Sequence, residues 1–143
     1  MGVILDTCVW IECMASRLSV EDVVRVCHEQ PVFLSVISLG ELHFGVEACA
    51  DPALRARRYT QLRKLNNRPI LPVTADTAAG FGVLAAAVRQ TCRSPRPRYN
   101  DLWIAAQAVE NDYALLTLNP GDFAGLPGLQ LMTLKPRTGC SGT

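Results

Sequence analysis

The first residues of the chain place the strongest constraint on its fold. Val3, Ile4 and Leu5 form an uninterrupted apolar run that ends at Asp6. A short run without polar alternation is typical of a strand buried on both faces, as in a parallel sheet covered by helices. Asp6 would then lie at the carboxyl end of the strand, which is where open α/β sheets place their chemistry.

Short apolar runs alternate with segments of helical character along the rest of the chain. Helices are expected between five strands, which are 3–5, 32–34, 69–73, 113–116 and 129–134. This alternation predicts an α/β sandwich built on a parallel sheet, with more helix than strand. The 143 residues are expected to form one domain over 1–135, followed by a frayed tail at 136–143.

Composition and cysteine usage exclude several classes of protein. The net charge is +1, so any binding of nucleic acid must rely on local patches. No apolar run reaches the length of a membrane span, and the chain does not begin like a secretory signal. The six cysteines lack a CxxC pair and fall mostly in periodic apolar segments, so we expect reduced core residues. These features predict a cytoplasmic protein without membrane attachment.

Four acidic residues stand in stretches that are otherwise apolar or small. Asp6 ends the first apolar run, Glu41 lies in a helical segment, and Asp101 opens an almost wholly apolar helix. Asp122 follows a Pro-Gly turn, close to Asn119. Each has an ordinary structural explanation when taken singly, because aspartate is common at helix starts and in turns.

The predicted helix face around Glu41 adds weight to a functional role. Glu41 shares this face with Ile37, Ser38, Phe44 and Gly45, which are apolar or small, so the face is expected to turn inward. Burying an unpaired carboxylate costs on the order of several kcal/mol unless the group is paired or binds a metal. A partly exposed glutamate at the edge of the face is the alternative.

Together, the four acids favour a metal site. Carboxylates gathered without a counter-charge repel one another and raise one another's pKa. A hard divalent cation such as Mg²⁺ or Mn²⁺ relieves this repulsion and prefers oxygen ligands. Acidic clusters of this kind suit the metal-assisted cleavage of phosphodiesters.

The order of these stretches resembles the PIN domain family, and more narrowly the VapC-type ribonuclease toxins of bacterial toxin–antitoxin pairs. The resemblance runs from Val3 to about Leu134. It implies a three-layer α/β/α sandwich around a central, mainly parallel, twisted sheet. Its four motifs are Leu5-Asp6-Thr7 with Val9-Trp10-Ile11-Glu12, residues 35–45, residues 100–106 and residues 116–123.

The resemblance also implies a set of site residues. Asp6, Glu41 and Asp101 would be both catalytic residues and metal ligands. The fourth motif leaves two candidates open, with Asp122 favoured as a catalytic acid just outside the metal ligands and Asn119 as a residue lining the site. Hydroxyl support for the ligands is expected from Thr7 and Thr117.

The activity implied by the resemblance is metal-dependent hydrolysis of RNA. The carboxylates would hold one or two Mg²⁺ ions, for which Mn²⁺ would substitute, and a metal-activated water would attack the phosphorus. The target can be tRNA, ribosomal RNA or messenger RNA. Members of the family usually form homodimers and are silenced by an antitoxin, so the expected partners are RNA, a cognate antitoxin and a second copy of the chain.

Substrate RNA requires positive charge around an acidic centre. The basic segment 55–68 is explained at least as well by a solvated helix face, whereas a proline-broken basic loop leads directly into Asp101. Trp10 and Trp103 could stack on a base or fill an interface, with core or dimer packing favoured for Trp103. The preferred candidates for phosphate contacts are Arg93, Arg96 and Arg98.

Rival classes fit the sequence less well. Haloacid-dehalogenase-like phosphatases need a second aspartate two residues after the first, and this chain has Cys8 there. A receiver domain needs an early acid pair and a late lysine, and neither is in place. The remaining alternative is a PIN-like scaffold that binds RNA or a partner without nuclease activity, which metal-dependent cleavage would exclude.

Overall fold

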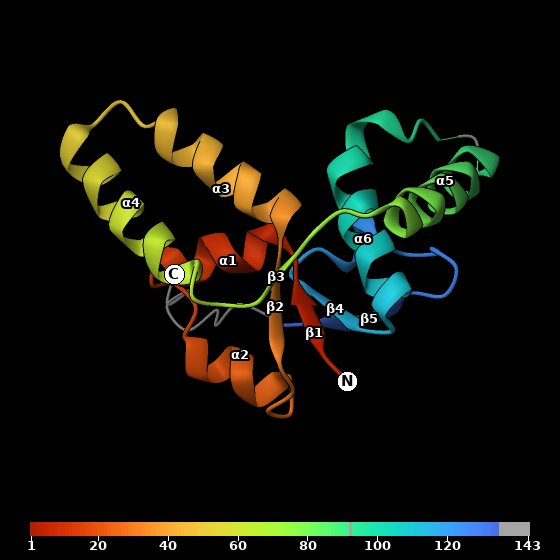
Figure 1. Cartoon of the computed structure of the whole chain (residues 1–143), viewed down its shortest axis with the longest axis horizontal. Coiled ribbons are helices and arrows are strands. Elements are labelled where there is room, and N and C mark those ends of the chain that lie inside the picture. The colour runs from red at the N-terminus through yellow and green to blue at the C-terminus, as the bar shows by residue number, and fades with distance from the viewer. Residues whose placement is uncertain (92, 135–143) are drawn as a thin grey trace, which may run out of the picture.

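A five-stranded sheet forms the centre of the molecule (Figure 1), and every neighbouring pair of strands is parallel, in the order β3-β2-β1-β4-β5. The computed structural model describes residues 1–91 and 93–134, so the predicted tail at 136–143 lies outside the described residues. The parallel α/β architecture is confirmed. The strands are β1 Val3–Leu5, β2 Val32–Ser35, β3 Ile70–Leu71, β4 Ala114–Thr117 and β5 Gln130–Thr133.

Helices cover both faces of the sheet. In Figure 1, α1 to α4 lie on one side of the strands and α5 and α6 on the other, which gives the predicted three layers. Two short 3-10 turns, η1 Arg96–Arg98 and η2 Pro120–Asp122, precede α6 and follow β4. The helices are α1 Thr7–Met14, α2 Val20–Val26, α3 Val36–Glu47, α4 Pro52–Leu65, α5 Ala75–Gln90 and α6 Tyr99–Asn111.

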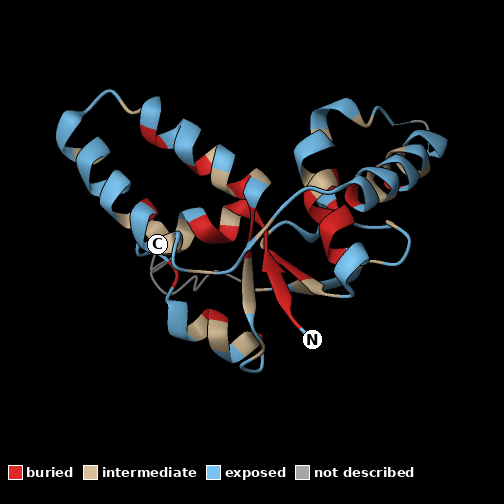
Figure 2. Cartoon of the chain, in the orientation of Figure 1, coloured by how far each residue is buried: buried red, intermediate tan, exposed pale blue. Residues whose placement is uncertain are grey.

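Alternate residues of β1 pack into two separate cores. Val3 and Leu5 belong to the core under α1 to α4, whereas Ile4 belongs to the core under α5 and α6. All three side chains are buried, and Figure 2 shows the buried strands between the buried inner faces of the helices. The uninterrupted apolar run is therefore explained, because a strand covered on both faces has no side that meets water.

The local chemistry of the sequence sets most helix starts. Pro52 occupies the first turn of α4, where its missing N–H costs nothing. Side-chain oxygens accept hydrogen bonds from the first turns of α1 to α5, and the residues that provide them are Asp6, Ser19, Ser35, Asp51 and Thr74.

The ends of α2 and β3 have identifiable causes. Helix α2 ends at Val26, and the chain then enters the left-handed region at His28 and Glu29, with φ of 53° and 60°. The strand predicted at 69–73 is shortened to β3, because the prolines at either side of it have no N–H for the sheet.

The described residues contain neither a disulfide nor a membrane-spanning helix. No helix in the described part of the chain is long and apolar enough to cross a membrane. Cys92 and Cys140 lie outside the described residues. The other four cysteines form no disulfide, and they are Cys8, Cys13, Cys27 and Cys49.

A buried amide joins α6 to the edge of the sheet. Gln107 is fully buried, and its Nε2 donates to the carbonyl oxygens of Leu71 and Pro72, each at 3.0 Å. Its Oε1 accepts a short hydrogen bond from the hydroxyl of Ser35, at the end of β2. The amide therefore ties the short β3 to β2 and to the helix that carries Asp101.

We expect Gln107→Leu to destabilise the fold by about 1–3 kcal/mol, because it leaves a buried hydroxyl and two carbonyl groups without their partner. Urea unfolding followed by circular dichroism measures the change in the free energy of unfolding. Gln90→Leu at the exposed end of α5 is the matched control and should change it by less than about 0.5 kcal/mol. Equal stabilities of the two variants would contradict this role.

Candidate active site

Polar side chains replace the apolar core at the carboxyl edge of the sheet. Asp6 follows β1 directly, and Thr117 is the last residue of the neighbouring β4. The backbone N–H of Asp6 donates to the carbonyl oxygen of Leu116 at 2.9 Å, which keeps the two strand ends in register. Parallel pairing therefore brings together two residues that lie 111 positions apart in the sequence.

The Asp6 carboxylate is buried and held by three donors. Its Oδ1 accepts from the backbone N–H of Thr7 at 2.8 Å. Its Oδ2 accepts from the hydroxyl of Thr117 at 2.8 Å and from the thiol of Cys8 at 3.2 Å. Only 5% of the residue is exposed, so these contacts restrict its orientation. Thr117 therefore contacts the Asp6 carboxylate directly, as its predicted supporting role requires.

A chain of hydroxyl groups orients Glu41. The hydroxyl of Thr7 donates to Glu41 Oε1 at 2.9 Å, and its oxygen lies 2.8 Å from the hydroxyl of Ser38. Because Thr7 has one proton and gives it to Glu41, Ser38 must donate to Thr7. Ser38 is a site residue that was not predicted from the sequence. A hydroxyl one helical turn before Glu41 is the signal that would have identified it.

The expected orientation of α3 is only partly correct. Its buried stripe is Ser38, Leu42 and Val46, so Glu41 lies at the edge of the stripe. Phe44, which was expected to turn inward with Glu41, is 74% exposed, and Gly45 is exposed as well. A half-exposed edge suits a ligand, because its carboxylate remains reachable from solvent.

Asp101 is the electrostatic centre of the site. It lies in the first turn of α6, which begins after Arg98, so it does not cap the helix. Its pKa is raised to about 6, first by burial and then by the charges of Asp6, Asp122 and Glu41, against a lowering by Arg98. The fold therefore places all four predicted acids within electrostatic reach of one another.

The fourth motif sits at the exposed margin of the site. Asp122 lies in η2, and its Oδ1 is 3.8 Å from Nη2 of Arg98. Nη1 of Arg98 also donates to the backbone oxygen of Asp122 at 2.9 Å. Asn119 is exposed, and its backbone N–H donates to the Thr117 hydroxyl at 3.0 Å. Both open candidates of this motif thus adjoin the acidic site.

The predicted contacts to nucleic acid receive mixed support. Arg93 and Arg96 are exposed, but Arg98 is already engaged by Asp122. Trp10 is buried and its indole N–H donates to the carbonyl oxygen of Leu5 at 3.1 Å, so stacking on a base is excluded for this residue. Trp103 stacks on Phe81 with ring centroids 4.1 Å apart, in agreement with the favoured packing role.

The donor set matches a hard divalent cation in chemistry and in charge. Carboxylate oxygens are the preferred ligands of Mg²⁺ and Mn²⁺, and the pKa of Asp101 is raised by burial and by repulsion from neighbouring carboxylates, both of which a bound cation would offset. However, no three acidic, histidine or cysteine side chains in the described parts of the chain already converge as ligands. The site therefore has the donors and the charge of a metal centre without a closed ligand cage.

The raised pKa of Asp101 makes a prediction about stability. Because the folded-state pKa exceeds the ordinary value of 3.8, the folded protein binds more protons between about pH 4 and pH 6. Stability is therefore lost as the pH rises through this window. We expect Asp101→Asn to raise the melting temperature of the metal-free protein at pH 7.5 by roughly 2–5 °C, a value reduced by solvent screening of this half-buried group.

The difference in melting temperature between Asp101→Asn and the wild-type protein should be smaller at pH 4.5, where Asp101 is protonated in the folded protein. Differential scanning fluorimetry in EDTA at pH 4.5 and at pH 7.5 measures this difference. Asp112→Asn, an exposed residue at the other end of α6, is the matched control and should leave the melting temperature unchanged at both. A lower melting temperature for Asp101→Asn at pH 7.5 would contradict the electrostatic account.

Curated proteins similar to this chain include bacterial ribonucleases. The chain is 34% identical over 125 residues to Ribonuclease VapC5 of Mycobacterium tuberculosis, a match that covers 87% of each protein. It is 31% identical over 101 residues to Ribonuclease VapC4 of the same organism, covering 71% of this chain and 75% of the relative.

Solved structures and a family comparison agree with these matches. The fold is similar to that in VapBC2 from Rickettsia felis bound to a promoter DNA fragment, with a TM-score of 0.80, 21% identity, and coverage of 94% of this chain and 100% of that one. VapBC-5 from M. tuberculosis matches with a TM-score of 0.71, 29% identity, and coverage of 94% and 99%. The PIN domain family matches residues 3–128, which include all four acids. The chain belongs to the PIN domain family.

Proposed function

We propose that this protein is a metal-dependent endoribonuclease and the toxin of a toxin–antitoxin pair. The observation that carries the proposal is that Asp101 is partly buried beside Asp6, Asp122 and Glu41, because this burial and these three charges together raise its pKa. The relatives named as ribonucleases support the choice of RNA as substrate. Whether the target is tRNA, ribosomal RNA or messenger RNA stays open.

Asp6, Glu41 and Asp101 would hold the metal. When bound, Mg²⁺, or Mn²⁺ in its place, supplies Lewis-acid activation of water and charge stabilisation at the phosphate. The protein contributes orientation: the Thr117 and Cys8 donors fix the Asp6 carboxylate. We assign the direct contacts with the ion to these three carboxylates.

The supporting residues act through the carboxylates. Thr7 donates to Glu41 and so points this half-exposed side chain along one direction. Asp122 is exposed at the margin of the site, where it can accept a proton from a water molecule without touching the ion. Asn119 would line the same margin and offer its amide to the RNA.

The partners follow from the same proposal. Solved relatives are toxin–antitoxin complexes, VapBC-5 among them, so we propose a cognate antitoxin that blocks the site of this chain. We also propose a homodimer, from the resemblance, and action in the cytoplasm, where RNA substrates are present. The whole of 1–135 would act as one nuclease domain.

We expect Asp6→Asn and Asp101→Asn each to lower metal-dependent RNA cleavage by more than about 100-fold, because each removes a charged ligand worth several kcal/mol of stabilisation. A fluorogenic RNA assay in Mg²⁺ measures the rate, and circular dichroism verifies the fold. Asp112→Asn removes one negative charge from the same helix as Asp101 and should cleave at the wild-type rate. Retained cleavage in both site variants would defeat the catalytic assignment.

Removal of the metal is the second expectation. Cleavage should cease in EDTA and return when Mg²⁺ or Mn²⁺ is added in excess, whereas Asp101→Asn should remain inactive after either addition. The same fluorogenic assay reports both steps. Cleavage that continues in EDTA, or RNA binding without cleavage under every metal condition, would favour the scaffold alternative.

A further inference from the structure

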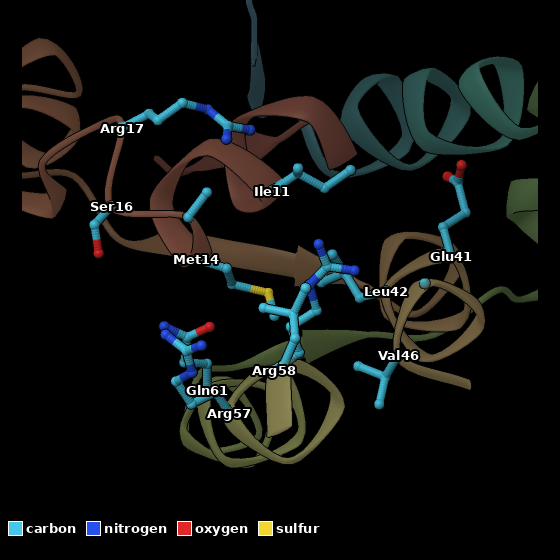
Figure 3. Close-up of a pocket in the computed structure, with 13 residues that line it drawn as sticks. Ile11, Met14, Ser16, Arg17, Glu41, Leu42, Val46, Arg57, Arg58 and Gln61 are labelled. Atoms are coloured by element: carbon cyan, nitrogen blue, oxygen red, sulfur yellow. The ribbon is translucent and has the colours of Figure 1, made fainter. Parts of the chain in front are cut away.

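Helix α4 lies against the rest of the protein without contributing much to its core. Leu62 is its one buried residue, and most of its other side chains are exposed. Between α4, α1 and α3 lies a pocket of about 460 Å³ (Figure 3). The helix therefore forms a wall of this pocket rather than a packed layer.

The residues with which α4 lines the pocket are mostly polar. Leu54, Arg57, Arg58 and Gln61 follow the i, i+3, i+4, i+7 spacing of a single helix face. A helix that faces a core has apolar residues at such positions. Here two exposed arginines and a half-buried glutamine line an open pocket, and Figure 3 shows Arg58 extending from α4 toward the space between α1 and α3.

The two arginines are not neutralised by the protein itself. In the parts of the chain that the structure describes, Arg57 and Arg58 form no ion pair and no side-chain hydrogen bond. Arg55 on the same helix, in contrast, pairs with Glu47 at 2.5 Å. Arg17, which also lines the pocket, pairs with Glu12 at 2.8 Å. Arg57 and Arg58 are therefore available to an external anion.

The pocket adjoins the candidate active site through Glu41. This residue lines the side of the pocket formed by α3, and its carboxylate turns toward Thr7 in the acidic site. A polyanion that approaches four carboxylates is repelled unless nearby cations contact its phosphates. Arg98, the cation that was expected to do this, is held by Asp122.

We infer that Arg57 and Arg58 bind backbone phosphates of the RNA strand on the Glu41 side of the acidic site. This inference rests on the proposed nuclease function and specifies how the substrate is held. Guanidinium groups form two parallel hydrogen bonds to a phosphate, which gives them both charge and direction. The apolar part of the pocket includes Ile11 and Met14, whose accessible side chains offer a surface against which bases can pack.

A protein segment is the competing occupant. The apolar lining would accept hydrophobic side chains, but a purely apolar segment would cover two exposed guanidinium groups and remove their water without replacing its hydrogen bonds, which is costly. An anionic strand satisfies both arginines at once. RNA is therefore the occupant that this charge distribution favours.

The test measures RNA binding apart from cleavage. Fluorescence anisotropy with a labelled single-stranded RNA, in EDTA and in an Asp101→Asn background, compares the parent with R57Q/R58Q over a series of NaCl concentrations. The matched control is R63Q/K64Q, which removes the same charge from exposed positions of α4 that do not line the pocket. Circular dichroism verifies that each variant folds.

We expect R57Q/R58Q to weaken RNA binding at least tenfold and to reduce the slope of log K against log salt by about 1.4, as for two lost phosphate contacts on a single strand. The control should keep most of the parental affinity and slope. An equal loss in both variants, an unchanged affinity in R57Q/R58Q, or no RNA binding by the parent would overturn the inference. Loss of antitoxin binding with intact RNA binding would assign the pocket to a protein segment instead.

The two proposals fail in different ways. A wild-type protein that binds RNA through Arg57 and Arg58 but never cleaves it in Mg²⁺ or Mn²⁺ refutes the nuclease and leaves the binding surface in place. A protein that cleaves RNA normally, with R57Q/R58Q showing an unchanged KM and kcat, refutes the binding surface alone. The inference predicts a raised KM and a nearly unchanged kcat for this variant.

Discussion

Mutual repulsion among carboxylates is the constraint on which the rest of this structure depends. Four acids from separate parts of the chain lie within electrostatic reach of one another at the carboxyl edge of a parallel sheet, and burial together with the charges of the other three raises the pKa of Asp101 to about 6. The fold must offset this cost elsewhere. It does so with a sheet whose central strand β1 is buried on both faces and with hydroxyl groups that hold the acids in place.

The hydroxyl groups matter because they stabilise the carboxylates without neutralising their negative charge. Thr117 donates to Asp6, and Ser38 donates through Thr7 to Glu41. A lysine or arginine at these positions would pair with the acids and compete with a cation. Arg98 approaches closest to that role, but its short contact is to the backbone of Asp122 at the margin. The centre of the site thus keeps its negative charge for a metal.

Much of this arrangement is readable from the sequence, because the signals are local. The run Val3–Leu5 has no polar residue, and only a strand covered on both sides tolerates that pattern. The carboxyl end of such a strand then locates Asp6. Ser35 marks the start of the helix that carries Glu41, whereas the helix that carries Asp101 begins at Tyr99 without a side-chain cap.

What the sequence does not reveal depends on long-range packing. Phe44 shares the helical spacing of Glu41, yet α3 packs through Ser38, Leu42 and Val46, and spacing alone cannot select between neighbouring faces. Arg98 has the composition of a phosphate ligand, but the fold brings Asp122 against it from 24 residues away. That Arg57 and Arg58 have no acidic partner among the described residues can be seen only from the packing of α4 against α3 and α1.

The most direct test of the central claim is a crystal of the wild-type protein soaked in Mn²⁺ and measured for anomalous scattering. The account predicts a strong anomalous peak between the carboxylates of Asp6 and Asp101, with Glu41 turned toward it, and no such peak in Asp6→Asn. A fully ordered site without anomalous density at saturating Mn²⁺ would show that these acids gather for a reason other than metal binding.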